Sequence, residues 1–375
     1  MFKAHVAGSI AGRRSTNGRD EQAGEGDGVA RAAKLAFFDI SESNNGLRVP
    51  LLSTMFATGY NDAGARVYSA SWGNTNLNSY SSFDHQADSF MYVQNSLKYP
   101  HIGPCKQTFS SPVISLRSHR YKNPDFLFVV AAGNSGRDRP SKSIATPGLN
   151  KNGITVGASQ SSSPRNKAGM LGPGYLAEFS SRGPTKDGRR KPDIVAPGMY
   201  IQSARARPDS QGECDDSEGL AFKSGTSMAT PLVSGTAALI RQYFEEGWHV
   251  SGEASPSDGF SPRASLVKAV IVNGAVELQG VQDDQTGQVT ELAAYDMNQG
   301  FGRVNLLKSL PIAGKNDFKG VFINSRTLST GGTHKFDVLI SHDNSCSEPL
   351  SVSLVWSDPP VGPMCEESCK NLLWS

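Results

Sequence analysis

The chain has 375 residues and a formal net charge of +2, with 37% hydrophobic and 19% charged residues. This composition is ordinary for a globular protein, and the length favours one large domain plus part of a second. The basic residues are scattered rather than clustered, which argues against nucleic-acid binding. No apolar run is long enough to span a bilayer, so we expect no membrane span in this chain.

The cysteines give no metal-binding pattern. None of them forms a Cys-x-x-Cys pair, which argues against a zinc site. Their odd number fits either free thiols or an incomplete set of disulfides. The five are Cys105, Cys214, Cys346, Cys365 and Cys369.

Short apolar runs that end in glycine or polar residues are typical of strands buried on both faces. Such runs are Lys34–Ile40, Ala65–Gly73, Asp125–Asn134, Gly153–Ser159 and Asp193–Gly198. Helical patterns lie between or after them, over Ser82–Tyr92, Thr226–Phe244 and Ala264–Val272. Strands that alternate with helices predict an α/β fold, a doubly wound parallel sheet flanked by helices.

Two segments depart from this pattern. Residues 93–121 mix prolines, a cysteine and two histidines without a clear period, so we expect an atypical insert that packs poorly. From about residue 310 no helical pattern follows, and Lys335–Ile340 and Leu350–Trp356 are strand-like. We therefore expect residues 310–375 to form the truncated start of an all-β domain, a sandwich or a barrel.

The strongest chemical signal is the run Ser224-Gly225-Thr226-Ser227-Met228-Ala229-Thr230-Pro231. A serine that follows a glycine turn and opens a helix exposes its hydroxyl beside the positive end of the helix dipole. Pro231 would suit the first helical turn, where a missing N–H costs nothing. Taken alone, such a run is more often a capped helix with an ordinary serine.

The run resembles the nucleophile motif of the subtilase family of serine endopeptidases. Other stretches resemble the same family in the same chain order, which makes coincidence negligible. They are HVAG (His5–Gly8), SWG (Ser71–Gly73), AAGNSG (Ala131–Gly136), FSSRGP (Phe179–Pro184), KPDIVAPG (Lys191–Gly198) and GFGRVN (Gly300–Asn305). The resemblance implies a subtilisin-like peptidase domain over residues 1–309, with Ser227 as its catalytic nucleophile.

The resemblance also implies roles for residues around Ser227. Asn134 would be catalytic, because its amide would donate to the oxyanion of the tetrahedral intermediate together with the Ser227 N–H. The Thr146-Pro147 bond resembles a position where the family has a cis peptide. Substrate would bind along two backbone segments made by Ser71, Trp72, Gly73, Ala131, Ala132 and Gly133.

The catalytic base of the family has no counterpart in this sequence. The family motif is His-Gly-Thr-His-Val-Ala-Gly, and its first histidine is the base; here that position is Phe2. His5 matches the second, structural histidine, about one helical turn away. The triad order is Asp, His, Ser, and Asp39 follows His5, so it does not match the catalytic Asp. We expect an N-terminally incomplete peptidase domain that lacks the His and Asp of the triad.

Two functions follow from the resemblance. The first is a serine endopeptidase that hydrolyses peptide bonds through an acyl-enzyme on Ser227, inactive as written because its base is absent. The second is a non-catalytic homologue that binds peptides or proteins. A lipase-type hydrolase would need Gly-x-Ser-x-Gly, and Ala229 stands at the last position.

The resemblance further implies a polypeptide substrate, a monomer and no cofactor for catalysis. Structural calcium is common in the family, but no residue of this sequence is assigned to it. The family also implies a secreted protein or one of the endomembrane lumen.

Overall fold

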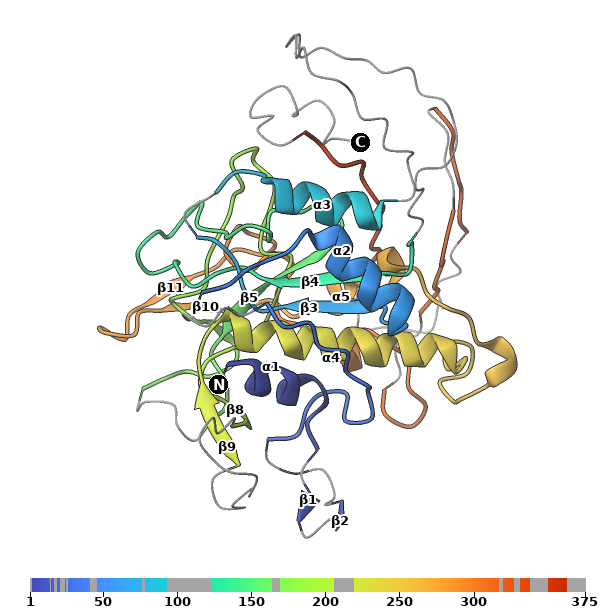
Figure 1. Ribbon diagram of the computed structural model, residues 1–375, viewed down its shortest axis with the longest axis horizontal. Helices are drawn as coiled ribbons and strands as arrows, with labels where there is room; N and C mark the ends of the chain where they lie inside the picture. Colours follow the sequence, from blue (N-terminus) through green and yellow to red (C-terminus); the bar gives the residue numbers. More distant parts are fainter. Residues whose placement is uncertain are drawn as a thin grey trace.

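The computed structural model describes residues 2–13, 15–16, 19–20, 24, 26–40, 46–75, 78–92, 123–163, 169–205, 219–316, 320–326, 331–337 and 350–362. Within these residues a mixed seven-stranded sheet forms the centre, with helices on both faces (Figure 1). The strand order is β11-β10-β6-β5-β4-β3, and β7 pairs with β5. The strands are β3 (Val67–Ala70), β4 (Leu127–Ala131), β5 (Ile154–Ser159), β6 (Tyr175–Leu176), β7 (Ile194–Pro197), β10 (Gly280–Gln282) and β11 (Val289–Glu291).

The sheet is parallel at its centre and mixed toward one edge. The pairs β3–β4, β4–β5, β5–β7 and β6–β10 are parallel, whereas β5–β6 and β10–β11 are antiparallel. The expected α/β architecture is therefore confirmed, but the sheet is not wholly parallel. Two short ribbons lie outside it, β1 (Ser15–Thr16) with β2 (Arg19–Asp20), and β8 (Ile201–Ala204) with β9 (Leu220–Lys223).

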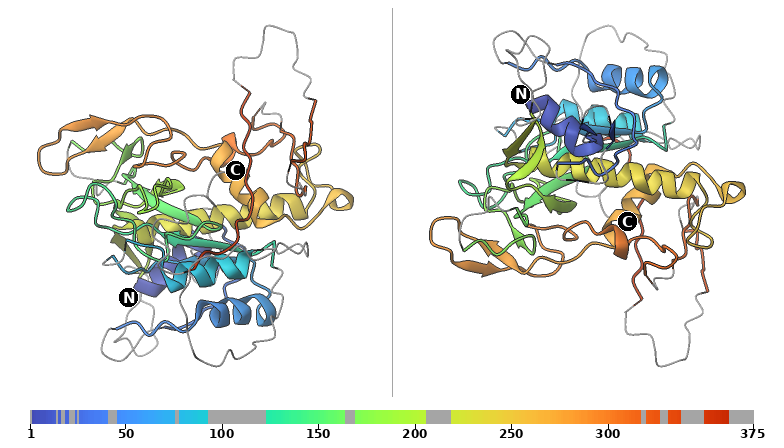
Figure 2. Two further views of the ribbon diagram at one scale, coloured as in Figure 1. Left: turned by 90° about the horizontal axis from the view of Figure 1, so that it is seen from above. Right: turned by 90° about the horizontal axis from the view of Figure 1, so that it is seen from below.

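The helices cover both faces of the sheet, and α1 lies beside α4 (Figure 2). They are α1 (Phe2–Ala11), α2 (Leu52–Ala57, continued by a π-helical turn Thr58–Asp62), α3 (Ser82–Met91), α4 (Thr226–Glu245) and α5 (Ala264–Asn273). Short 3₁₀ turns lie at Pro256–Asp258 and Leu306–Lys308. Of the helices in the described ranges, none combines the length and apolar character needed to cross a membrane.

Strand β4 explains why its run is apolar at every position. Successive side chains of a strand point to opposite faces of the sheet. Leu127 and Val129 belong to the core formed with α4 and α5, whereas Phe128 and Val130 belong to the core formed with α2 and α3. All four side chains are fully buried, so both faces require apolar residues.

Four of the five expected strands and all three expected helices are present, and one strand prediction is wrong. Lys34–Ile40 has no regular secondary structure. Leu35 and Phe37 are 50% and 63% exposed, and only Ile40 reaches the core. A strand requires a ladder of backbone hydrogen bonds to a neighbour, and this stretch belongs to none of the sheets of the described residues, although Ile40 O accepts from Arg48 N at 2.9 Å.

The segment after residue 310 gives a second correction. Leu350–Trp356 forms no strand; Val352 and Leu354 are 81% and 80% exposed. Lys335–Asp337 is also irregular, and residues 338–349 and 363–375 lie outside the described part. An isolated strand with no partner for its backbone or its apolar face is unstable. The all-β domain therefore stays a prediction, as does the insert at 93–121, of which the structure describes none.

A buried cluster of three charges fixes the start of β7. Asp193 accepts hydrogen bonds from Lys191 Nζ at 2.6 Å and from Thr155 N at 2.8 Å, and its other oxygen lies 3.1 Å from Lys268 Nζ. Burial lowers the pKa of Lys191 to about 8. Burial alone would raise the pKa of Asp193, but the charges of Lys191 and Lys268 outweigh it and hold that pKa at about 2.

We predict that Asp193→Asn destabilises the fold by about 3–5 kcal/mol at pH 7, because two buried ammonium groups lose their counter-charge. The pKa of Asp193 is depressed on folding, so its stabilising effect is complete above pH ~4 and declines as the pH falls toward ~2. The gap between wild type and variant should shrink over that range in urea unfolding curves. Asp62→Asn, at an exposed position, is the control and should change stability by less than about 0.5 kcal/mol. Equal losses in both variants would contradict a structural role for the cluster.

Candidate active site

Ser227 lies in the first turn of α4, where the chain turns out of β9. Gly225 precedes the helix with φ of 146°, a conformation that favours glycine. A Cβ at Gly225 would lie 3.3 Å from Asn134 Nδ2, so the turn brings α4 close to the end of β4. The Ser227 side chain is nearly buried at 9% exposure, and its hydroxyl donates to the Ser71 carbonyl at 3.1 Å.

Pro231 has a different role from the one its position suggested. It is the sixth residue of α4 rather than part of the first turn, so it removes the N–H that would bond the Ser227 carbonyl. The Ser71 hydroxyl donates to that carbonyl at 2.9 Å instead. Two reciprocal hydrogen bonds therefore join the end of β3 to the start of α4.

Asn134 is oriented by the residue next to Ser227. Its Oδ1 accepts hydrogen bonds from Thr226 N at 2.8 Å and from Thr226 Oγ1 at 3.0 Å. The Thr226 hydroxyl oxygen also accepts from Gly133 N at 3.1 Å. Because Oδ1 is engaged, the Asn134 amide hydrogens and the first-turn Ser227 N–H are the donors left at this corner. Two such donors can stabilise a developing oxyanion.

The segment Ser71–Gly73 lies beside the loop that carries Thr146. Asn74 N donates to Thr146 O at 2.9 Å, and Thr146 N donates to Asn74 O at 3.2 Å. A Cβ at Gly73 would lie 3.0 Å from the Thr146 carbonyl oxygen, so the backbones of the two segments approach closely. The cis Thr146-Pro147 peptide expected from the sequence is confirmed.

The remaining expected site residues contribute mainly backbone. Ala131 and Ala132 are 5% and 0% exposed. Gly133 has φ of 107°, and a Cβ there would lie 2.8 Å from Ser181 Oγ. Trp72 is half-buried against Phe83, with ring centroids 6.1 Å apart, so its indole is already packed onto α3.

No histidine in the described residues has a recorded hydrogen bond to Ser227. His5 is fully buried, and its Nε2 lies 3.0 Å from the carbonyls of both Ile201 and Ala221. Burial lowers the pKa of His5. These contacts join α1 to the β8–β9 ribbon, as expected of a structural histidine. The side chain of Phe2, at the family's base position, lies outside the described part.

The other histidines of the described ranges have different neighbours. His85 contacts the Val361 carbonyl, His249 packs against Phe244 and Phe260, and His334 lies near Phe336. His101, His119 and His342 lie outside the described residues.

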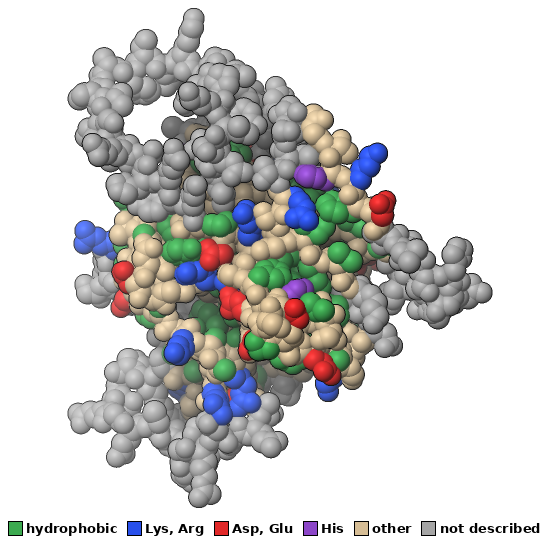
Figure 3. Space-filling model, turned by 90° about the vertical axis from the view of Figure 1, so that its right-hand side faces the viewer, with side chains coloured by type: hydrophobic (Ala, Val, Ile, Leu, Met, Phe, Trp, Pro, Cys, Tyr) green, Lys and Arg blue, Asp and Glu red, His purple; other side chains and the backbone are tan. Residues whose placement is uncertain are grey.

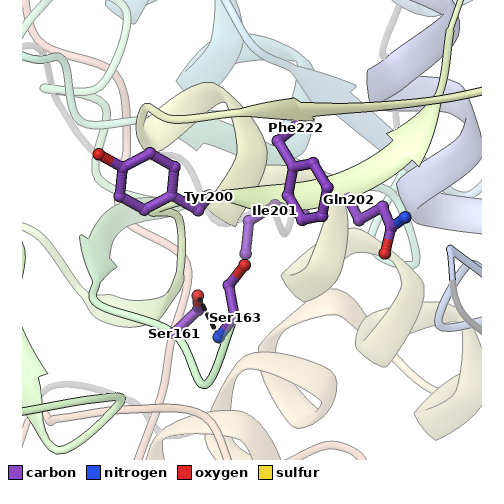
Figure 4. A pocket seen from close by; sticks show the side chains of 6 residues that line it. All are labelled: Ser161, Ser163, Tyr200, Ile201, Gln202 and Phe222. Carbon is purple, nitrogen blue, oxygen red and sulfur yellow. Dashed lines mark hydrogen bonds between the residues drawn. The ribbon is translucent and has the colours of Figure 1, made fainter. Parts of the chain in front are cut away.

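A shallow cavity of about 190 Å³ lies near the candidate active site, but none of the expected site residues lines it. Figure 4 shows the Phe222 ring beside Ile201, and the Tyr200 hydroxyl directed away from these two residues. Tyr200 N donates to Ser224 Oγ at 2.9 Å, which connects the cavity wall to the turn before α4. The lining residues are Ser161, Ser163, Tyr200, Ile201, Gln202 and Phe222.

The surface shown in Figure 3 carries acidic and basic side chains interspersed with apolar ones. Such a face presents no single-sign field to a charged polymer. Across the described residues, no group of three or more His, Cys, Asp or Glu side chains could hold a metal ion.

A serine at the start of a helix that packs across a mixed α/β sheet is the arrangement of a subtilisin-like serine peptidase fold. A sequence model described as "Subtilase family" matches residues 4–302. The chain therefore belongs to the subtilase family.

Several curated proteins are similar to the chain. The serine protease/ABC transporter B family protein tagB of Dictyostelium discoideum is 30% identical over 317 residues, covering 74% of this chain and 16% of that protein. The serine protease/ABC transporter B family protein tagD of the same organism is 27% identical, covering 95% of this chain and 23% of that protein. Serine protease AprX of Bacillus subtilis is 45% identical over 117 residues, covering 30% of this chain and 25% of that protein. The chain spans a quarter or less of the length of these relatives.

Solved structures are more distant. The self-cleaved protease domain of PatA has a TM-score of 0.49 and 20% identity, covering 81% of this chain and 80% of its own. Sphericase has a TM-score of 0.48 and 22% identity, covering 81% and 77%.

The connecting roles of Thr226 and Ser71 are not evident from the sequence alone. For Ser71 the sequence offered one signal, the proline four residues after Ser227. Such a proline leaves the Ser227 carbonyl without its helical donor, and the Ser71 hydroxyl then binds that carbonyl. No comparable signal marked Thr226, whose role depends on how close β4 and α4 approach.

We predict that Thr226→Val destabilises the chain by about 1–3 kcal/mol, because Gly133 N–H and Asn134 Oδ1 lose a hydrogen-bonding partner. The Asn134 side-chain NH₂ signals should also shift in NMR spectra. Thr226→Ser keeps the hydroxyl, so those signals should stay in place. A shift of the same size in both variants would show that the hydroxyl does not orient Asn134.

Proposed function

We propose that this chain carries the nucleophile and oxyanion half of a serine endopeptidase. The observation that carries the proposal is the corner where Ser227, in the first turn of α4, lies beside Asn134. The Oδ1 of Asn134 is engaged by Thr226, and its amide hydrogens remain as donors. Family membership and relatives named as serine proteases support the reaction class. The substrate would be a polypeptide, and the chemistry needs no cofactor.

The proposed reaction is acyl transfer followed by hydrolysis. Ser227 Oγ attacks the peptide carbonyl carbon while a base removes its proton, and the carbonyl oxygen becomes an oxyanion. The Ser227 N–H and the Asn134 amide would donate to that oxygen. Collapse breaks the C–N bond, the amine takes up the proton, and water then releases the acyl group from Ser227.

The wall for the peptide would come from the two backbone segments beside this corner, Ser71–Gly73 and Ala131–Gly133. Gly73 has no side chain, so an extended chain could approach its backbone closely. The backbone N–H and carbonyl groups of Ala132 and Gly133 are already bonded within the fold, so these two residues would contribute contact surface rather than new hydrogen bonds. Hydrogen bonds to backbone bind any sequence, so this wall alone would give little side-chain preference.

The base is the missing element of the proposal. Ser227 Oγ donates to a backbone carbonyl, which cannot take its proton away at neutral pH. The family's base position is Phe2 in this sequence. We infer that residues 1–375 alone retain only the catalysis due to binding and the oxyanion donors. In a subtilisin that remaining activity is about 10³–10⁴ over water.

A non-catalytic role remains the second candidate, and the same hydrogen bond favours it. A serine hydroxyl held by the Ser71 carbonyl, with no base among its recorded partners, leaves peptide-binding surfaces without a reactive nucleophile. A module of this kind would bind an extended peptide and leave it intact.

Fluorophosphonate labelling separates these cases, with Ser227→Ala as the blank. We predict very slow labelling of the wild-type chain and about 10–100-fold faster labelling of Phe2→His. The range follows from a subtilisin, where losing His costs about 2 × 10⁶ in kcat and losing Asp alone about 3 × 10⁴. Lys3→His, one position along the helix, is the matched control and should give no gain.

Fast labelling of the wild-type chain would overturn the missing-base account. Binding of an extended peptide by a Phe2→His variant that still does not label would favour the non-catalytic role. A Phe2→His variant that neither labels nor binds an extended peptide would contradict both candidate functions.

A further inference from the structure

Residues 350–362 cross the surface as an extended segment next to α3 (red in Figure 1). Val352 and Leu354 point into solvent, so apolar burial does not hold this segment. Its described contacts are mainly hydrogen bonds, from α3, from α5 and from the loop before β5. The part that contacts α3 and the loop has the sequence Trp356-Ser357-Asp358-Pro359-Pro360-Val361-Gly362.

Asn152 forms a reciprocal pair with the backbone of Asp358. Asp358 N donates to Asn152 Oδ1 at 2.7 Å, and Asn152 Nδ2 donates to Asp358 O at 2.9 Å. The amide side chain thus reproduces the two-bond pairing of a β-ladder. Only Asn and Gln offer a donor and an acceptor in this geometry.

Further donors serve the carbonyls on the proline side. His85 Nδ1 donates to Val361 O at 2.7 Å, and Lys151 Nζ donates to Pro359 O. Prolines suit such a site, because they have no N–H that needs a partner and their fixed φ lowers the entropy lost on docking. His85, Lys151 and Asn152 therefore form a donor surface that binds main-chain carbonyls of an extended, proline-containing segment.

The residues that present these donors are fixed from beneath by Asp88 of α3. This carboxylate is fully buried and accepts hydrogen bonds from Lys151 N, from Asn152 N at 2.9 Å, and from Tyr80 OH at 2.7 Å. The bound segment and the loop at 151–152 are therefore connected to α3 by an unbroken set of hydrogen bonds.

One turn earlier on α3, Asp84 continues the connection toward the candidate active site. It accepts from Ser81 N at 2.9 Å and from Thr146 Oγ1 at 2.6 Å. Thr146 in turn pairs with Asn74, directly after Gly73. Helix α3 thus holds, at Asp88, the loop that binds the docked segment and, at Asp84, the Asn74–Thr146 bridge beside the proposed peptide wall.

We propose that the donor surface formed by His85, Lys151 and Asn152 is a receptor for an extended Asp-Pro-Pro-Val segment. Residues 356–362 occupy it as an internal ligand, and their docking stiffens the Asn74–Thr146 bridge through α3. The position of this bridge beside a peptide-binding wall rests on the proposed function. The docking and the stiffening are independent of catalysis.

The test is amide hydrogen exchange in the whole chain with two variants at one position. Asp358→Pro removes the N–H that bonds Asn152, whereas Asp358→Ala keeps the backbone pair. We expect Asp358→Pro to speed exchange at Asn74 and Thr146 about ten-fold, and Asp358→Ala to change it less than about two-fold. Core amides of β4 and β5 should be unchanged in both, which shows that the variants are folded.

A synthetic peptide spanning Leu354–Gly362 completes the test. Added at about millimolar concentration to Asp358→Pro, it should restore slow exchange at Asn74 and Thr146, while a scrambled peptide should not. Unchanged exchange at these two amides in Asp358→Pro would overturn the coupling. Failure of the peptide to restore protection would overturn the receptor role. Neither readout depends on peptidase activity, so failure of the proposed function would leave both results interpretable.

Discussion

The first turn of α4 is bonded to two parallel strands at once, and the candidate active site depends on this connection. Ser71, after β3, binds the Ser227 carbonyl that Pro231 leaves without a helical partner. Thr226 binds Gly133 and Asn134, after β4. Because neighbouring parallel strands end at the same edge of a sheet, the two connections bring a hydroxyl and an amide to one corner.

Buried carboxylates lie on both sides of the sheet, and Asp84 of α3 is connected to this corner through Thr146 and Asn74. On one side Asp84 and Asp88 of α3 bind the loops at 146 and 151–152. Burial raises the pKa of both carboxyl groups, and each is compensated by several hydrogen bonds. On the other side Asp193 is held between two lysines at the start of β7. Because hydrogen bonds within such a network strengthen one another, the loops at 146 and 151–152 both depend on α3 for their position.

The central strands and the helices could be predicted from the sequence because continuous apolar runs and helical periods are local signals. Lys34–Ile40 and Leu350–Trp356 carry the same kind of run, yet neither is a strand, because a strand also requires a ladder of backbone hydrogen bonds to a neighbouring strand. The antiparallel pairs involve β6 and β11, strands of two and three residues, too short to give a pattern.

In the candidate site, too, some residues could be predicted from the sequence and others could not. The residue types Ser227 and Asn134 stand out in the sequence because their motifs are contiguous. The parts contributed by Thr226, Ser71 and Asp84 join segments that are 62 to 156 residues apart in the chain. Only the folded chain brings these segments together, so no local pattern could reveal them.

We propose that this corner holds a serine nucleophile without a base. The pH dependence of fluorophosphonate labelling at Ser227 tests it most directly. Where an imidazole accepts the proton, the rate levels off above its pKa, about 6.5 for an unperturbed histidine. Without a base we predict a steady rise of about ten-fold per pH unit from pH ~5.5 to ~9, as hydroxide increases. A plateau that begins near pH 7 would show that an imidazole serves Ser227, and would contradict the claim.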